Sequence, residues 1–136
     1  MSRAAWIRWL EIVLAVVLVY AVVLVVAGSV AGSLFSALGF GPSGAIDTPA
    51  VHDYLRLPFM VLGAVLAGWS VTMLQLVRGP LRDGSQWVVP ILIRSVAVWF
   101  VLDTGMSLVL GFPTHALFNV PFGVALALPL VNLRST

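Results

Sequence analysis

Asp103, His115 and Asn119 are the polar side chains of this sequence that fall inside or beside apolar segments and could therefore do chemistry there. They lie in the stretch WFVLDTGMSLVLGFPTHALFN, residues 99–119. Moving a charged group into hydrocarbon costs at least ~2.5 kcal/mol, so an ionisable residue in such a segment predicts a functional site. A carboxylate and an imidazole together could open an epoxide or isomerise a double bond by acid–base catalysis.

Helical spacing predicts how these side chains meet. His115 and Asn119 are four residues apart and share one face of a helix, as Asp103 and Ser107 share a face of the preceding helix. If the two faces meet, they line a small polar cavity near the outer membrane surface. Arg56, at the same depth on an earlier helix, is expected to contact Asp103, with His115 within one water of the pair.

Two interpretations of this candidate polar site stay open, a structural lock and a working site. Asp103 paired with Arg56 and an imidazole would stabilise the fold in the first case and serve a substrate in the second. The sequence lacks a His-x-x-x-His or Glu-x-x-His spacing that would let His52 and His115 bind a metal. No nucleophile elbow surrounds Ser107. Catalytic residues therefore stay unknown, whether the protein is an enzyme stays open, and no metal or cofactor is predicted.

The composition places these residues in a membrane protein. Of 136 residues, 61% are hydrophobic and 9% charged, against about 25% charged in soluble domains. The length accommodates four spanning helices of about 20 residues with short connections and leaves no room for a soluble domain. The seven basic residues are scattered arginines, which argues against a nucleic-acid partner. The absence of cysteine excludes disulfides and thiol redox chemistry.

The apolar runs predict an all-α, integral membrane four-helix bundle in a single domain, residues 1–136. Prolines near the start of a run are acceptable in a first helical turn, and the first run is longer than the apolar core of a signal peptide. A short interfacial segment, at about residues 34–40, is expected between the first two helices. The predicted spans cover about residues 7–31, 58–77, 87–110 and 116–133.

Small residues and prolines predict how these helices pack. Gly28 and Gly32 form a Gly-x-x-x-Gly pattern, and Gly63 and Gly68 lie on a small-residue face, which favours close helix contact. The short GFPTH connection predicts an antiparallel hairpin of the last two helices. Pro121 and Pro129, in the last helix, should each free one backbone carbonyl a turn earlier.

The arginines predict the orientation. Arg3, Arg8, Arg78, Arg82 and Arg134 fall on one side of a four-span arrangement, and Arg56 falls on the other. By the positive-inside rule, both termini are then cytoplasmic.

A separate feature of the inner side is the pair Glu11 and Arg94. Arg94 lies nine residues before Asp103, about 180° around an ideal helix, so it cannot share that residue's face. Glu11 is therefore its expected partner if it does not reach solvent, and Arg8, one turn before Glu11, competes for the same carboxylate.

The runs PFMVLGAVLAGWSVTMLQLVRGPLRDG, WFVLDTGMSLVLGF and HALFNVPFGVALALPL resemble uncharacterised small four-helix bacterial membrane proteins, broadly DoxX-like. The resemblance covers roughly residues 56–133. It implies a four-helix bundle in the bacterial inner membrane and carries over no catalytic residues. The sequence lacks the central carboxylate of the small multidrug transporters and the polar filter pattern of the fluoride channels.

The predicted function is a structural or accessory role, in which this small multi-pass protein packs against a larger membrane complex or itself. The expected partners are the lipid bilayer and a membrane protein or a second copy, and no nucleic acid. The alternative is a membrane-embedded enzyme or transporter for a small amphipathic molecule, which would occupy an outward-facing polar cavity around Asp103 and His115.

Overall fold

The computed structural model describes residues 1–28, 37 and 49–134. Within these residues the secondary structure is helical and contains no strand, which confirms the all-α prediction. Four helices are long and apolar enough to cross a membrane. Apart from residue 37, the predicted interfacial segment at residues 34–40 lies outside the described part of the chain, as does Gly32.

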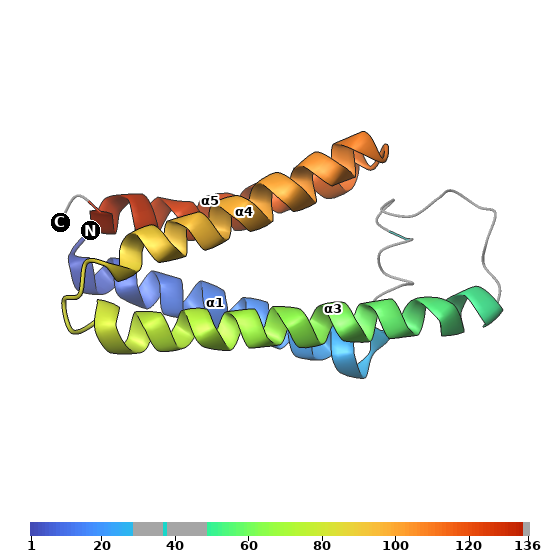
Figure 1. Ribbon diagram of the computed structural model, residues 1–136, viewed down its shortest axis with the longest axis horizontal. Coiled ribbons are helices and arrows are strands. Elements are labelled where there is room, and N and C mark those ends of the chain that lie inside the picture. Colours follow the sequence, from blue (N-terminus) through green and yellow to red (C-terminus); the bar gives the residue numbers. More distant parts are fainter. Residues whose placement is uncertain (29–36, 38–48, 135–136) are drawn as a thin grey trace. The chain divides into compact units, whose positions relative to one another are not determined.

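Figure 1 shows the helices in the order of the sequence. Their bounds are α1 Arg3–Val26, α3 Pro49–Leu76, the π-helix η1 Val77–Leu81, α4 Val88–Val109 and α5 Pro113–Arg134. The 22 residues of α4 and of α5 give each a length of about 33 Å at 1.5 Å per residue. This matches a hydrocarbon core of about 30 Å.

Three helices begin earlier than the sequence predicts. α1 begins at Arg3 rather than Ile7, α3 begins at Pro49 rather than Pro58, and α5 begins at Pro113 rather than Ala116. Proline is favoured in the first turn because its missing N–H has no helical partner there. That rule holds at Pro49 and Pro113, whereas Pro58 lies inside its helix. Polar residues such as Asp53 do not delay the start of α3, since helix formation does not require an apolar sequence.

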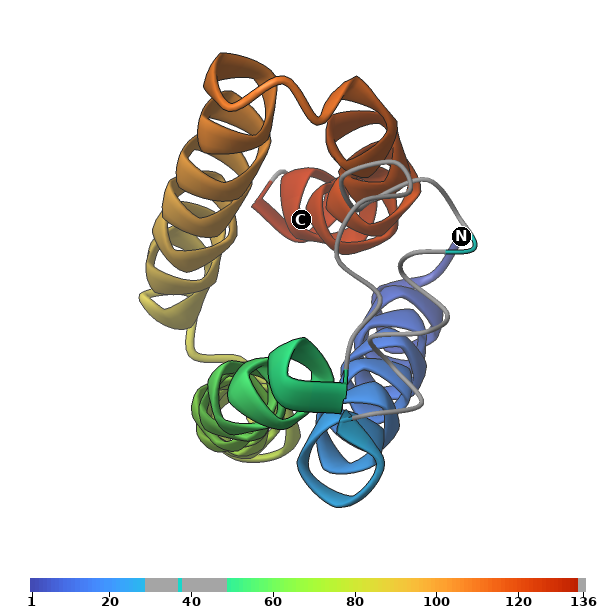
Figure 2. The ribbon, with the colours of Figure 1, turned by 90° about the vertical axis from the view of Figure 1, so that its right-hand side faces the viewer.

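The described chain forms two compact units. The first contains Met1–Ala15 and Thr72–Thr136, and the second contains Val16–Val71. The first unit includes the start of α1, the end of α3, η1, α4 and α5, and the candidate site lies in it. α4 and α5 pack against each other as an antiparallel hairpin, as predicted, and Figure 2 shows the short connection between them.

The buried positions of α1 and α5 follow a spacing of three and four residues. They are Ile7, Leu10, Leu14, Val17, Ala21 and Leu24 on α1, and Ala116, Asn119, Gly123, Leu126, Leu130 and Leu133 on α5, where Pro129 is buried in addition. This spacing places one narrow stripe of each helix against its neighbours. Asn119 is the single polar side chain in either stripe, and it is 4% exposed.

Two polar contacts tie the start of α1 to the end of α3 and η1. Arg82 Nη2 donates to Glu11 Oε1 at 2.7 Å, so Arg82, and not Arg94, is the partner of Glu11. Arg3 Nη2 donates to the carbonyl of Leu81, also at 2.7 Å. Arg94 is exposed, which agrees with the solvent alternative, whereas Arg82, which directly follows η1, was not predicted as the partner of Glu11.

Trp9 compensates for a proline in α5. Pro129 has no N–H, so the carbonyl of Ala125, four residues earlier, loses its helical donor. The indole Nε1 of Trp9 donates to this carbonyl at 2.9 Å. The carbonyl without a helical donor is therefore present, as predicted for Pro129. Its hydrogen bond with Trp9 anchors the start of α1 on α5.

Gly63 and Gly68 differ in their surroundings within the second unit. A Cβ built on Gly63 would lie 2.6 Å from the carbonyl oxygen of Ala21 and 2.9 Å from Leu24 Cβ, whereas one on Gly68 would meet nothing within 4 Å. Gly63 thus allows α1 and α3 to approach closely, as predicted. Gly68 makes no such close contact within the described chain, and its packing against another copy or a partner stays a prediction.

Candidate functional site

The connection between α4 and α5 sets the geometry of the candidate site. α4 ends at Val109, and Gly111 follows with a φ of 80°, a conformation that glycine adopts without strain. The N–H of Phe112 donates to the carbonyl of Ser107 at 2.7 Å, and that of Gly111 donates to Leu108 at 3.1 Å. This pair of bonds is a Schellman motif, which closes the helix and reverses the chain.

α5 starts immediately after this turn. Pro113 is its first residue, where the fixed φ of proline favours a helix. His115 therefore lies within the first turn of α5, and Asn119 lies one turn later on the same face. The motif and the proline together bring this face opposite the last two turns of α4.

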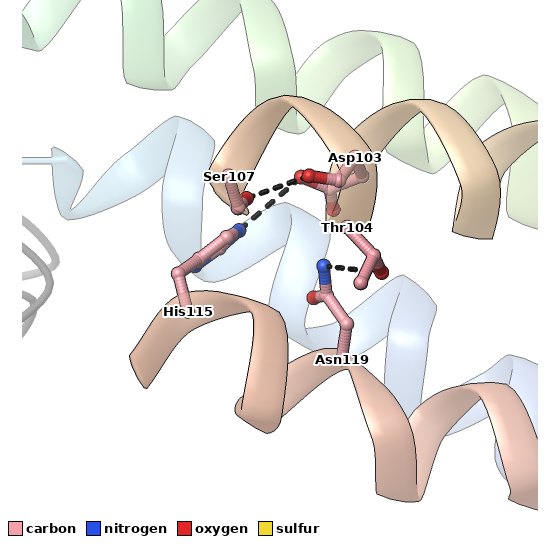
Figure 3. Close-up of polar contacts among 5 residues, drawn as sticks. All are labelled: Asp103, Thr104, Ser107, His115 and Asn119. Carbon is pink, nitrogen blue, oxygen red and sulfur yellow. Dashed lines mark hydrogen bonds and ion pairs between the residues drawn. The ribbon is translucent and has the colours of Figure 1, made fainter. Parts of the chain in front are cut away.

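Asp103 and His115 meet across the hairpin. His115 Nε2 lies 3.2 Å from Asp103 Oδ1 (Figure 3). A carboxylate only accepts hydrogen bonds, so the bond requires a proton on Nε2 of the imidazole. The side chains are 26% exposed for His115 and 36% for Asp103. The predicted proximity of these two residues is present, with a direct contact in place of a water bridge.

Ser107 does not complete a catalytic triad with this pair. Its hydroxyl donates to the backbone carbonyl of Asp103 at 2.6 Å, one turn earlier on α4. A serine nucleophile would instead need its hydroxyl bonded to the imidazole that removes its proton. His115 and Asp103 thus form a hydrogen bond between the two helices. Ser107 forms one to the backbone of its own helix.

Asn119 makes the second contact across the hairpin. Its Nδ2 donates to Thr104 Oγ1 at 3.3 Å (Figure 3). Thr104 was not predicted as a partner, although the stripe spacing of α5 offers a signal, because it puts Asn119 in the buried seam. A polar side chain in such a seam fixes the register of the two helices, since sliding them would leave its amide without a partner.

Arg56 lies on α3 in the second compact unit and is exposed. The contact between Asp103 and Arg56 stays a prediction. His52 lies in the same helix, and its side chain lies outside the described residues, as does Asp47. Of the predicted site residues, the structure therefore brings together Asp103 and His115 directly, and Asn119 beside them through Thr104.

The described residues include no group of three or more His, Asp or Glu side chains that could hold a metal ion. Asp103 and His115 alone supply two donors, one fewer than a catalytic zinc site uses. A cavity of about 320 Å³ lies on the same hairpin, farther from the turn, and its lining is apolar. The predicted polar cavity around Asp103 stays a prediction.

No protein-family model, curated protein or solved structure matches the chain.

Proposed function

We propose that this protein is a small multi-pass membrane protein with a structural or accessory role, which packs in the bilayer against a larger membrane complex or against itself. The observation that carries the proposal is the pairing of the hairpin's polar side chains with one another. Asp103 bonds His115, and Asn119 bonds Thr104. Among the described residues, the one buried side-chain polar atom without a partner is Arg3 Nη1, which belongs to a different part of the first unit.

The exposed apolar surface of the helices supports a location in the lipid bilayer. In the most apolar window of each candidate span, between 22 and 39% of residues are buried. Most of the apolar surface is therefore open to lipid or to a partner protein. Soluble proteins rarely expose continuous apolar areas of this kind.

The arginines and the resemblance to DoxX-like proteins support the finer location, which is the bacterial inner membrane with both termini in the cytoplasm. Arg78 lies in η1 and Arg82 directly follows it, before α4 begins. Arg3 and Arg8 begin α1, and Arg134 ends α5. An even number of spans is consistent with this distribution.

Replacing Asp103 by Asn separates the structural role from the alternative, an enzyme or transporter that uses Asp103 and His115. Partial exposure of this pair favours the alternative, because a small molecule could reach it. For a structural role, Asp103→Asn should lower the thermal stability in mild detergent and leave the co-eluting molecules unchanged. For a working site, it should preserve the stability and remove a co-eluting small molecule detected by mass spectrometry.

Asp83→Asn is the matched control, because Asp83 is an exposed carboxylate in the turn after η1. It should change neither the stability nor the co-eluting molecules. A protein that migrates as a bare monomer, with no second polypeptide and no second copy after cross-linking in native membranes, would contradict the accessory role.

A further inference from the structure

The apolar cavity on the α4–α5 hairpin, called here the hairpin groove, is lined by Val96, Ala97, Phe100, Gly123, Val124 and Ala127 together with neighbouring aliphatic residues. It exists because three of its lining positions carry little or no side chain. A Cβ on Gly123 would lie 2.7 Å from Phe100 Cδ2, so the phenyl ring fills the space above this glycine. Its volume of about 320 Å³ falls in the range of ligand-binding pockets.

The groove opens on the side of α5 opposite α1. Trp9 packs on α5 at Ala125, which lies two positions from both Gly123 and Ala127. Two positions correspond to about 160° around a helix, so the groove faces away from the Trp9 contact. The groove valines Val124 and Val131 are 55% and 61% exposed, respectively.

One end of the groove carries a positive charge. Arg134 follows the groove residues Leu130 and Val131 by four and three positions, and therefore lies on their face. Arg134 is exposed. α4 begins at this same end and α5 ends there, so the dipoles of the two helices offset each other and Arg134 carries the positive charge of this end.

The length of the groove matches one leaflet. On α5 the groove lining runs from Val120 to Val131, eleven positions or about 16 Å at 1.5 Å per residue, and half of a hydrocarbon core of about 30 Å is ~15 Å. A molecule that fits has an apolar chain one leaflet deep and an anion at the membrane surface. These are the properties of an anionic phospholipid, and basic pockets between spanning helices bind such headgroups.

We propose that the hairpin groove binds one acyl chain of an anionic phospholipid, with its phosphate at Arg134. A second copy on the same face is disfavoured, because a parallel two-fold arrangement would bring two Arg134 side chains together and like charges repel. The inference rests on the membrane location in the proposed function.

Native mass spectrometry of the full chain in mild detergent tests this site. The probes are phosphatidylglycerol and phosphatidylcholine with identical acyl chains. One phosphatidylglycerol should bind about fivefold more tightly than phosphatidylcholine, the preference expected from one arginine at a membrane surface. Arg134→Gln should remove the preference, whereas Arg8→Gln, at another exposed arginine, should retain it.

Ala127→Phe fills the groove and should weaken the binding of both lipids, with Ala97→Leu as a second filling variant from α4. Leu128→Phe is the control, because Leu128 is exposed and does not line the groove. Equal binding of both lipids to the unaltered protein, or binding unchanged in Arg134→Gln or in both filling variants, would overturn the proposal. Release of the protein from membranes by alkaline carbonate would instead refute the membrane location.

Discussion

The two polar contacts across the α4–α5 hairpin differ in their burial. Asp103 and His115 are each about one-third exposed or less, whereas Asn119 is 4% exposed. A buried amide that loses its partner costs about 1–3 kcal/mol. The Asn119 contact therefore has a measurable effect on stability, although Asp103 is the more conspicuous residue in the sequence.

Thr104→Val tests the contribution of the Asn119 contact. Valine keeps the shape of threonine but removes the acceptor Oγ1, so the free energy of unfolding should fall by about 1 kcal/mol. Adding Asn119→Leu removes the orphaned donor and should recover most of this loss. Denaturant or thermal unfolding in detergent measures both variants. Equal stability of Thr104→Val and the unaltered protein would mean that the 3.3 Å contact contributes nothing.

At the scale of the helix, Gly63 and Gly68 form a matched pair within α3. Gly63→Ala places a methyl group 2.6 Å from a carbonyl oxygen and 2.9 Å from Leu24 Cβ, so α1 and α3 must separate. We expect a loss of about 1–3 kcal/mol from overpacking. Gly68→Ala has open space and should gain up to ~1 kcal/mol from helix propensity. Thermal unfolding of the two variants should therefore shift in opposite directions, and a shared direction would contradict the packing role of Gly63.

Trp9 and Pro129 form a second pair, because one residue supplies the donor that the other removes. Trp9→Phe should destabilise the protein by about 1 kcal/mol, since the Ala125 carbonyl loses its hydrogen bond. Pro129→Ala restores a helical N–H for this carbonyl. In that background, Trp9→Phe should cost markedly less. A double-mutant cycle of unfolding free energies gives the comparison, and additive effects would show that the two residues act independently.

The sequence predicts the elements better than their partners. Helix periodicity and apolar length are local properties, so the four helices, the hairpin and the meeting of Asp103 with His115 across it could all be predicted. Partner choice depends on residues far apart in the chain, and several candidates are chemically equivalent. Arg8, Arg82 and Arg94 could each bond Glu11, and only the fold of η1 selects Arg82. Likewise, nothing in the spacing of Gly63 and Gly68 shows which of them meets α1.

At the scale of the whole molecule, the uneven distribution of arginines predicts the topology in the membrane. Alkaline phosphatase fused after Thr136 should be inactive, because this enzyme folds only outside the cytoplasm, and a cytoplasmic fluorescent reporter at the same place should be active. Moving the phosphatase to the connection between α4 and α5, after Gly111, should reverse the result. Phosphatase activity from the fusion at Thr136 would contradict the predicted arrangement, an even number of spans with both termini cytoplasmic.

The hydrogen bond from Trp9 to Ala125 also has a consequence for biosynthesis. Its two residues are 116 positions apart, and translation proceeds at about 5–20 residues per second. The indole therefore emerges from the ribosome roughly ten seconds before the carbonyl that it will bond. The contacts of Arg3 with Leu81 and of Glu11 with Arg82 can form earlier. The nascent chain thus holds α1 first through its arginine contacts, and the last helix completes the attachment only when synthesis is nearly over.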